Sequence, residues 1–294
     1  MISIKDLIRL LRPHQWIKSG FVFTGLLFGH AWDDMDMLTR VVLAAIAFSF
    51  VASGVYVFND LLDVAQDRAH PTKRNRPIAS GRVSVTGAGV LTGLMLGLGL
   101  AIGTYVHLSV LVLLAIYVVM NIAYSLGLKH VVILDVFIIS IGFMLRILVG
   151  TIGVGIEPSL WLLFCGMMVT LFLGFSKRRA ELYVQGGGVG TRKVLEHYSP
   201  LLLDLMIGVT LTCVIMSYSL YTMNERTIQF HGTEYLILTV PFVIYATFRY
   251  VYLLHMQGGG EDTARDFVKD AHILVTVVLW GLCVLVLIGG SRIF

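Results

Sequence analysis

The stretch Asn59-Asp60-Leu61-Leu62-Asp63-Val64-Ala65-Gln66-Asp67 follows directly on a long apolar run and decides how the rest of the chain is interpreted. Carboxylates at the end of a membrane helix cost free energy, so ionisable groups kept there indicate a functional site. At about 100° per residue, positions 59, 63 and 67 fan over one face of a helix. Hard oxygen donors at several depths on one face suit Mg²⁺ that holds a diphosphate.

The composition places the chain among membrane proteins rather than soluble domains. It has 294 residues, of which 57% are apolar and only 14% are charged, and its mean hydropathy is +0.84. Such values are typical of chains with several membrane spans. Cys165, Cys213 and Cys283 each lie in an apolar run without a paired spacing, so we predict neither a disulfide nor a zinc site.

Apolar runs long enough to cross about 30 Å of hydrocarbon occur nine times along the chain. The predicted spans are 16–31, 38–58, 83–106, 109–126, 131–150, 160–175, 201–222, 235–254 and 273–289. We therefore predict an all-α bundle of nine transmembrane helices that forms a single domain over residues 1–294.

The Lys and Arg residues gather on one side of the membrane when the N-terminus is placed inside. Eighteen of the 22 then face the cytoplasm, whereas Arg40, Arg226 and Arg292 face outward and Arg146 lies within a span. Because positive residues are retained on the cytoplasmic side, this predicts an inside N-terminus and an outside C-terminus in a bacterial-type plasma membrane. The long loops 59–82, 176–199 and 255–272 share the cytoplasmic face, so we expect the active site there.

Two further patterns concern packing and the membrane surface. The stretch 2–12 is amphipathic and basic, so we expect it to lie on the membrane surface and expect no cleavable signal peptide. Gly93-x-x-x-Gly97 and Gly99-x-x-x-Gly103 either permit close helix packing or simply reflect the composition of membrane helices.

Several motifs together resemble the UbiA superfamily of intramembrane prenyltransferases over essentially the whole chain. They are the nine spans, the acidic motif after the second span, Arg76-Pro77 with Gly81, and the opening Arg12-Pro13-x-x-Trp16-x-Lys18. The resemblance implies a helical bundle that holds a polyprenyl chain in a lipid-open cavity and binds diphosphate through Mg²⁺, or alternatively Mn²⁺, at the cytoplasmic mouth. It further implies a catalytic motif of Asn59, Asp60, Asp63 and Asp67, in which Asn59, Asp63 and Asp67 hold the metal. Asp60 either ligates the metal directly or orients one of its ligands.

The loop after the sixth predicted span departs from the aromatic prenyltransferases of this superfamily. Those enzymes carry a second acidic motif there, whereas this chain has the basic Ser176-Lys177-Arg178-Arg179-Ala180-Glu181-Leu182. A cluster of cations binds a phosphate directly, without a second metal. Together with the stretches 70–74, 76–79 and 127–130, this pattern is similar to the decaprenyl-phosphate phosphoribosyltransferase branch.

That branch implies transfer of the 5-phosphoribosyl group from phosphoribosyl pyrophosphate (PRPP) to a polyprenyl phosphate, with release of pyrophosphate, for cell-envelope glycan synthesis. We expect the lipid phosphate to attack C1 at an oxocarbenium-like centre without a general base, because a phosphate is already nucleophilic at neutral pH. The expected partners are PRPP, the lipid phosphate and the membrane, with no nucleic acid. The expected substrate-binding residues are Lys18, Lys73, Arg74, Arg76, Tyr124, Lys129, Lys177, Arg178 and Glu181.

Several charged residues keep two interpretations. Two interpretations apply to Lys73, Arg74 and the basic pair 177–178. These residues either contact phosphates or serve only as positive charges that keep their loops on the cytoplasmic side of the membrane. Lys129 contacts the lipid phosphate or anchors its helix at the interface. Glu181 steers the basic cluster or contacts a ribose hydroxyl.

Two sets of charged residues lie outside the main motifs. Asp135 and Arg146 are 11 residues apart on one helix face, too far to pair along a straight helix, and are either functional or structural. Asp262, Asp266 and Asp270 repeat at helical spacing, but Arg265 and Lys269 interleave with them, so we favour the start of a helix with a solvated face.

Two other functions remain open. A prenyl diphosphate-dependent aromatic prenyltransferase would share the fold and the metal motif, but it requires the second acidic site that the loop 176–199 lacks. A membrane transporter of an anionic solute would place charge near the bilayer midplane in repeated halves. Here the charges gather at one face and no repeat is evident.

Overall fold

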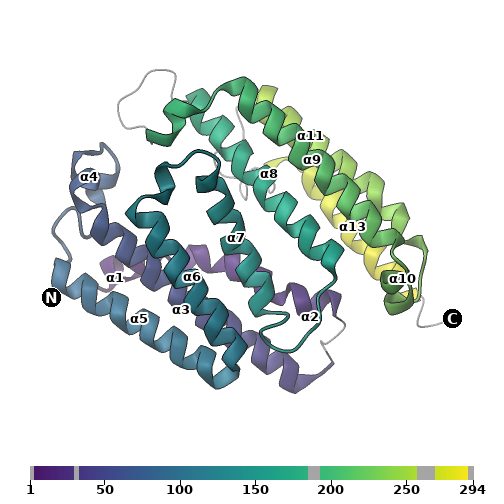
Figure 1. Ribbon diagram of the computed structural model, residues 1–294, viewed down its shortest axis with the longest axis horizontal. Helices are drawn as coiled ribbons and strands as arrows, with labels where there is room; N and C mark the ends of the chain where they lie inside the picture. Colours follow the sequence, from purple (N-terminus) through teal and green to yellow (C-terminus); the bar gives the residue numbers. More distant parts are fainter. Residues whose placement is uncertain (1–2, 30–32, 185–192, 257–268, 291–294) are drawn as a thin grey trace. The chain divides into compact units, whose positions relative to one another are not determined.

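The computed structural model describes residues 3–29, 33–184, 193–256 and 269–290, which are largely helical and contain no strand (Figure 1). The chain divides into two compact units, residues 1–158 and 159–294. The elements of the first unit are α1 Ile4–Leu11, η1 Pro13–Phe23, α2 Thr24–Phe28, α3 Met35–Leu62, α4 Val64–Ala69, η2 Lys73–Asn75, α5 Val85–Val106, α6 Leu108–Leu126, η3 Leu128–His130 and α7 Leu134–Val149.

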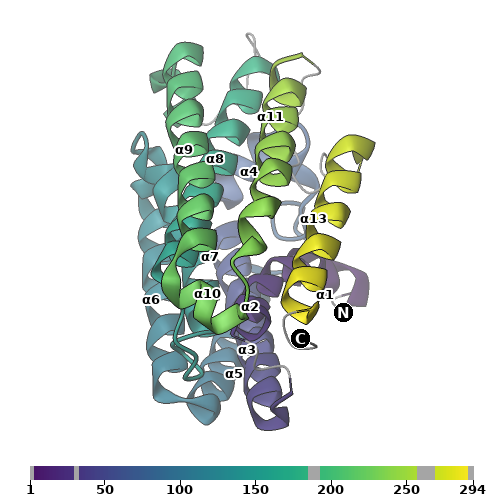
Figure 2. The same ribbon diagram turned by 90° about the vertical axis from the view of Figure 1, so that its right-hand side faces the viewer.

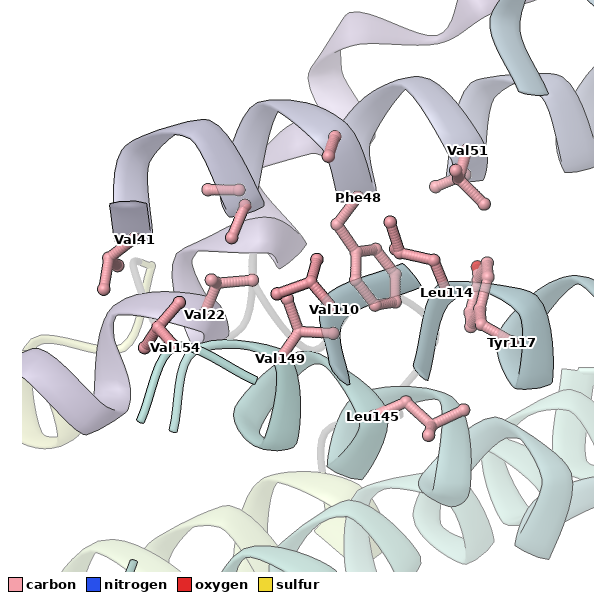
Figure 3. Packing of buried hydrophobic residues seen from close by; sticks show 14 of the residues in the cluster. Val22, Val41, Phe48, Val51, Val110, Leu114, Tyr117, Leu145, Val149 and Val154 are labelled. Carbon is pink, nitrogen blue, oxygen red and sulfur yellow. The ribbon is translucent and has the colours of Figure 1, made fainter. Parts of the chain in front are cut away.

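Helix α3 forms the centre of the first unit and packs against α5, α6 and the 3₁₀ helix η1. Its sequence is apolar on every face along most of its length, which is the pattern of a helix that is surrounded by others. Figure 3 shows the resulting core, in which Phe48 and Val51 of α3 face Leu114 and Tyr117 of α6. The Phe48 and Tyr117 rings lie 4.6 Å apart between centroids.

One of the two glycine motifs on α5 serves close packing and the other does not. A Cβ atom at Gly99 would lie 2.6 Å from Val51 Cγ2 and 2.8 Å from the Ala47 carbonyl oxygen of α3, and one at Gly103 would lie 2.7 Å from Leu114 Cδ1. Gly93 and Gly97 have no atom within 4 Å of the corresponding position. Gly99-x-x-x-Gly103 therefore permits close helix packing, whereas Gly93-x-x-x-Gly97 reflects only the composition of a membrane helix.

Helix α1 is fastened to α3 and to the loop that follows α4. The Trp16 indole N–H donates to Ser53 Oγ at 2.9 Å, and this hydroxyl donates in turn to the Leu11 carbonyl at 2.8 Å. Arg82 Nε donates to Asp6 Oδ1 at 2.9 Å. Arg12, which ends α1, adopts a left-handed backbone conformation with φ 51° and ψ 57°. The chain therefore turns sharply at Arg12 between α1 and η1.

The second unit is a set of long helices joined by short ones. Its elements are α8 Leu160–Val184, η4 Lys193–His197, α9 Pro200–Met223, α10 Glu225–His231, η5 Tyr235–Thr239, α11 Val240–Met256 and α13 Ala271–Gly290. Within the unit, α8 packs on α9 and α11 packs on α13 (Figure 2). The Trp280 indole N–H donates to Tyr218 Oη at 2.8 Å and so links α13 to α9.

The sequence predicts nine spans, and seven helices in the described residues are long and apolar enough to cross a membrane. The multi-span character is confirmed, whereas the count of nine is not. The predicted span 16–31 corresponds to η1 and the short α2, and the span 131–150 corresponds to α7, which has 16 residues. Both segments are apolar, but in the part of each that the structure describes there is no single α-helix of full span length.

Candidate active site

The acidic motif lies where α3 gives way to α4. Asn59 and Asp60 belong to the last turn of α3, Asp63 is the residue between the helices, and Asp67 lies in α4. The predicted single helix is interrupted at Asp63, although its N–H still donates to the Asn59 carbonyl and the Asp67 N–H donates to the Asp63 carbonyl. The four-residue spacing therefore survives the interruption, and the side chains remain near one another.

Every carboxylate of the motif is paired with a cation from elsewhere in the first unit. Asp60 Oδ1 accepts from Arg12 Nη2 at 2.6 Å and from Arg76 Nη1 at 3.0 Å. The same Arg76 nitrogen donates to Asp67 Oδ2 at 2.8 Å. Lys129 Nζ lies 2.7 Å from Asp63 Oδ1. The three carboxylates are thus paired with three cations.

Asn59 is oriented by a side chain from α6. The Ser125 hydroxyl donates to Asn59 Oδ1 at 3.0 Å, and the Asn59 amide nitrogen donates to Asp63 Oδ2 at 3.1 Å. These two bonds fix which way the amide points: its nitrogen faces the Asp63 carboxylate and its oxygen faces the Ser125 hydroxyl. Tyr124, one of the residues predicted to bind substrate, lies half-buried next to Ser125 on the same helix.

The donor set has the chemistry of a hard divalent cation, since it consists of carboxylate and amide oxygens. Asn59 and Asp63 are already in contact. Across the described residues, however, no three His, Cys, Asp or Glu side chains converge as metal ligands, because the carboxylates are directed at cations. The residue types therefore suit a divalent metal. In this conformation the carboxylate oxygens are bonded to Arg and Lys side chains instead.

The basic loop after α4 is shaped by its own side chains. His70 Nδ1 accepts from the backbone N–H groups of Thr72 at 3.2 Å and Lys73 at 3.4 Å. Arg82 Nη2 donates to the Asn75 carbonyl at 2.8 Å. Gly81 has φ +76°, a conformation that favours glycine. Lys73 and Arg74 occupy η2 within this loop, with Arg74 exposed to solvent.

The prediction of a basic loop at 176–182 is wrong, because the structure places these residues inside α8 of the second unit. The helix continues to Val184, since nothing in Lys177-Arg178-Arg179-Ala180-Glu181-Leu182 breaks it. Arg178 is only 2% exposed and pairs with Glu181 three residues later, while Lys177 is exposed. Arg179 Nε donates to Asp204 Oδ1 at 2.9 Å.

The remaining predicted residues fall in different surroundings. Lys18 lies in η1, with its ammonium 6.0 Å from the centroid of the Phe143 ring. Asp135 is fully buried in the first turn of α7. Arg146 is buried near the end of α7, over the rings of Phe48 and Tyr117 at 4.5 and 5.2 Å.

Of the predicted acidic repeat after α11, Asp262 and Asp266 lie outside the described residues. Asp270 precedes α13, and its Oδ1 accepts from the Ile273 backbone N–H at 3.0 Å. That contact is an N-terminal cap, which confirms the start of a helix at this position. Asp270 also pairs with Arg249 of α11 at 2.9 Å.

Two contributors to the site were missed in the sequence. Ser125 lies within an apolar run beside a more conspicuous tyrosine, and nothing in its spacing indicates a contact 66 residues away. Arg12 was noted as part of an N-terminal motif, but no sequence signal pairs it with Asp60. Both partnerships depend on how α1 and α6 pack against α3.

The all-helical fold and the acidic motif at the end of α3 together define the class of intramembrane prenyltransferases. The chain matches the UbiA prenyltransferase family over residues 20–269, and it belongs to that family. The resemblance seen in the sequence is thereby confirmed.

Relatives of known name cover nearly the whole chain. A decaprenyl-phosphate phosphoribosyltransferase from Corynebacterium glutamicum is 34% identical, over 95% of this chain and 85% of that protein. One of the same name from Mycobacterium tuberculosis is 30% identical, over 94% of this chain and 92% of that protein. Among solved structures, a UbiA homolog from Archaeoglobus fulgidus bound to GPP and Mg²⁺ has a TM-score of 0.70 at 17% identity and covers 98% of both chains. At that identity the likeness concerns the fold alone.

Proposed function

We propose that this chain transfers the 5-phosphoribosyl group of PRPP to a polyprenyl phosphate of decaprenyl type, releases pyrophosphate, and so supplies cell-envelope glycan synthesis. The observation that carries the proposal is the similarity to named decaprenyl-phosphate phosphoribosyltransferases over about 95% of the chain. The basic sequence Lys177-Arg178, in the place of a second acidic motif, supports the same choice of donor.

In this proposal the acidic motif receives the pyrophosphate end of PRPP. Asn59, Asp63 and Asp67 hold a divalent metal, Mg²⁺ or Mn²⁺, and Asp60 holds Arg12 and Arg76 beside them. A metal bound there supplies positive charge against the departing pyrophosphate. Arg76 and Lys129 lie within the same group of side chains and contribute further charge to the leaving group.

The lipid phosphate attacks C1 of the ribose as pyrophosphate leaves. No general base is needed, because the attacking phosphate oxygen is already deprotonated at neutral pH. The candidates for contacts with the other phosphates are Lys18, Lys73, Arg74, Tyr124, Lys129, Lys177 and Arg178. Glu181 steers the basic pair or contacts a ribose hydroxyl. Among the basic pair on α8, the exposed Lys177 is the more direct candidate, and Arg178 acts with its partner Glu181.

The proposal includes a membrane arrangement. The chain forms one domain with nine crossings, in which η1 with α2 and the 16-residue α7 serve as the two shorter ones. The N-terminus and the acidic motif face the cytoplasm, and the C-terminus faces outward. The asymmetry of Lys and Arg supports this orientation.

A transfer assay tests the function directly. Membranes that carry the protein are incubated with PRPP labelled in the ribose and with polyprenyl phosphate, and the label is expected in the lipid phase. A phenolic acid with a prenyl diphosphate serves as the competing substrate pair. Efficient turnover of that pair, with none of PRPP and polyprenyl phosphate, would replace the proposal with an aromatic prenyltransferase.

A further inference from the structure

The acidic motif carries its own counter-ions, and they are not equivalent. Arg12 is held by the turn that ends α1 and lies over the Tyr56 ring, 5.3 Å from its centroid, while it bonds to Asp60. Arg76 and Lys129 come from a loop and a short 3₁₀ helix. Arg12 therefore belongs to the frame of the site, whereas the other two cations come from segments outside the long helices.

Lys129 occupies the carboxylate that a metal needs. Its ammonium is 2.7 Å from Asp63 Oδ1, and the two side chains are 17% and 19% exposed. A divalent ion on the same oxygen would lie within about 5 Å of that ammonium. Positive charges at this distance repel strongly where water is partly excluded. Metal and ammonium therefore compete for Asp63.

Arg76 occupies the second carboxylate in the same way. One nitrogen, Nη1, bridges Asp60 and Asp67, and both carboxylates are nearly buried. If Arg76 leaves, Asp60 keeps Arg12 as its partner, so no buried carboxylate is left uncompensated there. Asp67 is then available to a metal.

We propose that Lys129 and Arg76 are exchangeable counter-ions, which bond to the motif's carboxylates before substrate arrives and move to the pyrophosphate group as a divalent metal takes the carboxylates. This inference rests on the proposed function of the site. Its consequence is that metal and pyrophosphate bind as a coupled pair, each raising the affinity for the other by the same factor. Metal alone has to displace the cations into solvent, and pyrophosphate alone has to draw them away from carboxylates.

The test measures binding rather than turnover. Mn²⁺ affinity of the purified full chain in detergent is measured by electron paramagnetic resonance, without and with inorganic pyrophosphate, at matched free Mn²⁺. The ratio of the two dissociation constants is the coupling factor. For the wild type we expect a coupling factor well above one.

Lys129→Met removes one exchangeable cation. We expect Mn²⁺ alone to bind roughly threefold to tenfold tighter, because a partly buried ion pair no longer has to be broken, and we expect the coupling factor to fall by a similar amount. Lys129→Arg keeps a cation and should restore the coupling. Lys5→Met, which removes an exposed cation from α1, is the matched control and should leave both quantities unchanged.

The outcomes separate exchange from simple repulsion. If Lys129 only repelled the metal, Lys129→Met would tighten Mn²⁺ binding equally with and without pyrophosphate, and the exchange would be wrong. Weaker Mn²⁺ binding in a stably folded Lys129→Met would overturn it as well. Phosphoribosyl transfer by the wild type decides the proposed function independently, because coupled binding of Mn²⁺ and pyrophosphate does not require that reaction.

Discussion

Asp63 is the residue at which α3 ends, and both oxygens of its carboxylate are engaged, one by Lys129 and the other by Asn59. We expect Asp63→Ala to lower turnover by at least about 100-fold, because the proposed function makes this carboxylate a ligand to the metal. Insertion and folding should persist, since the apolar faces of α3 are unchanged. Turnover is measured by label transfer to lipid, and folding by thermal unfolding in detergent.

Asp36→Ala is the matched control for that substitution. Asp36 is an exposed acid in the first turn of the same helix, at the end away from the motif. Its replacement should leave turnover unchanged. If Asp63→Ala retained its activity, the motif would not bind a catalytic metal. The same conclusion would follow if excess chelator left the activity of the wild type unchanged.

Ser125 is expected to act through Asn59. Ser125→Ala removes the hydrogen bond to Asn59 Oδ1 and frees the amide to turn, so the metal concentration needed for half-maximal rate should rise about tenfold. Ser125→Thr retains the hydroxyl and should remain close to wild type. An unchanged metal requirement in Ser125→Ala, measured by titration of Mg²⁺, would show that the amide is oriented by other contacts.

At this scale the sequence indicates candidate ligands but not the side chains that pair with them. Asn59, Asp63 and Asp67 are recognisable because local spacing and residue chemistry suffice to mark them. Ser125 is not, since its role arises only where α6 meets α3. Arg178 shows the same limit, because a basic run in the sequence reveals neither the burial of this side chain nor its pairing with Glu181 one helical turn later.

The two glycine motifs of α5 offer a direct comparison between helix packing and composition. Gly99→Ala would force a Cβ atom to within 2.8 Å of the Ala47 carbonyl of α3, and we expect a loss of about 1–3 kcal/mol in stability. Gly97→Ala meets nothing within 4 Å and should be neutral or slightly stabilising, because alanine favours a helix. Thermal unfolding of both variants decides the matter, and equal melting temperatures would contradict the close contact.

The pair between α11 and α13 predicts a pH dependence. The hydrogen bond from Arg249 holds the pKa of Asp270 below its ordinary value. The folded state therefore binds fewer protons at this group, and its stabilising effect is present above about pH 4 and is lost as the pH falls through the lower folded pKa. Asp270→Asn should lower the melting temperature at neutral pH, with the difference shrinking below about pH 4.

A second substitution at this position separates the ion pair from the helix cap. Asp270→Ala also removes the bond from the Ile273 N–H, so it should cost about 1 kcal/mol more than Asp270→Asn. A constant difference between Asp270→Asn and the wild type at every pH would mean that the ion pair does not form.

Elements are more predictable than their limits. Seven apolar runs became helices of span length, because hydropathy over about 20 residues is a strong local signal. The segments 16–31 and 131–150 are equally apolar, yet η1 adopts a tighter 3₁₀ winding and α7 ends at Val149. These limits depend on neighbouring segments of the fold, whose positions the sequence alone does not give. The interruption at Asp63 escaped prediction for a related reason, since helical periodicity continues across it.

For the molecule in its membrane, the orientation is the testable quantity. In a background without Cys165, Cys213 and Cys283, single cysteines are placed at Gln66 in α4 and at Tyr105, which is 82% exposed near the far end of α5. A membrane-impermeant maleimide should label position 66 only from the cytoplasmic side and position 105 only from the outer side. The reverse pattern would invert the proposed topology, and labelling of both from one side would exclude a crossing by α5.

The fastening of α1 has a consequence for the order of events during synthesis. Its partners lie far downstream: Arg12 bonds to a residue 48 positions later and Asp6 to one 76 positions later. At about 5–20 residues per second, roughly 4–15 seconds pass between translation of Asp6 and translation of Arg82. The first helix therefore has no complete docking site until both α3 and the loop after α4 have been made. The cations that pair with the acidic motif become available in the order of translation. Arg12 is made before the motif, Arg76 soon after it, and Lys129 last.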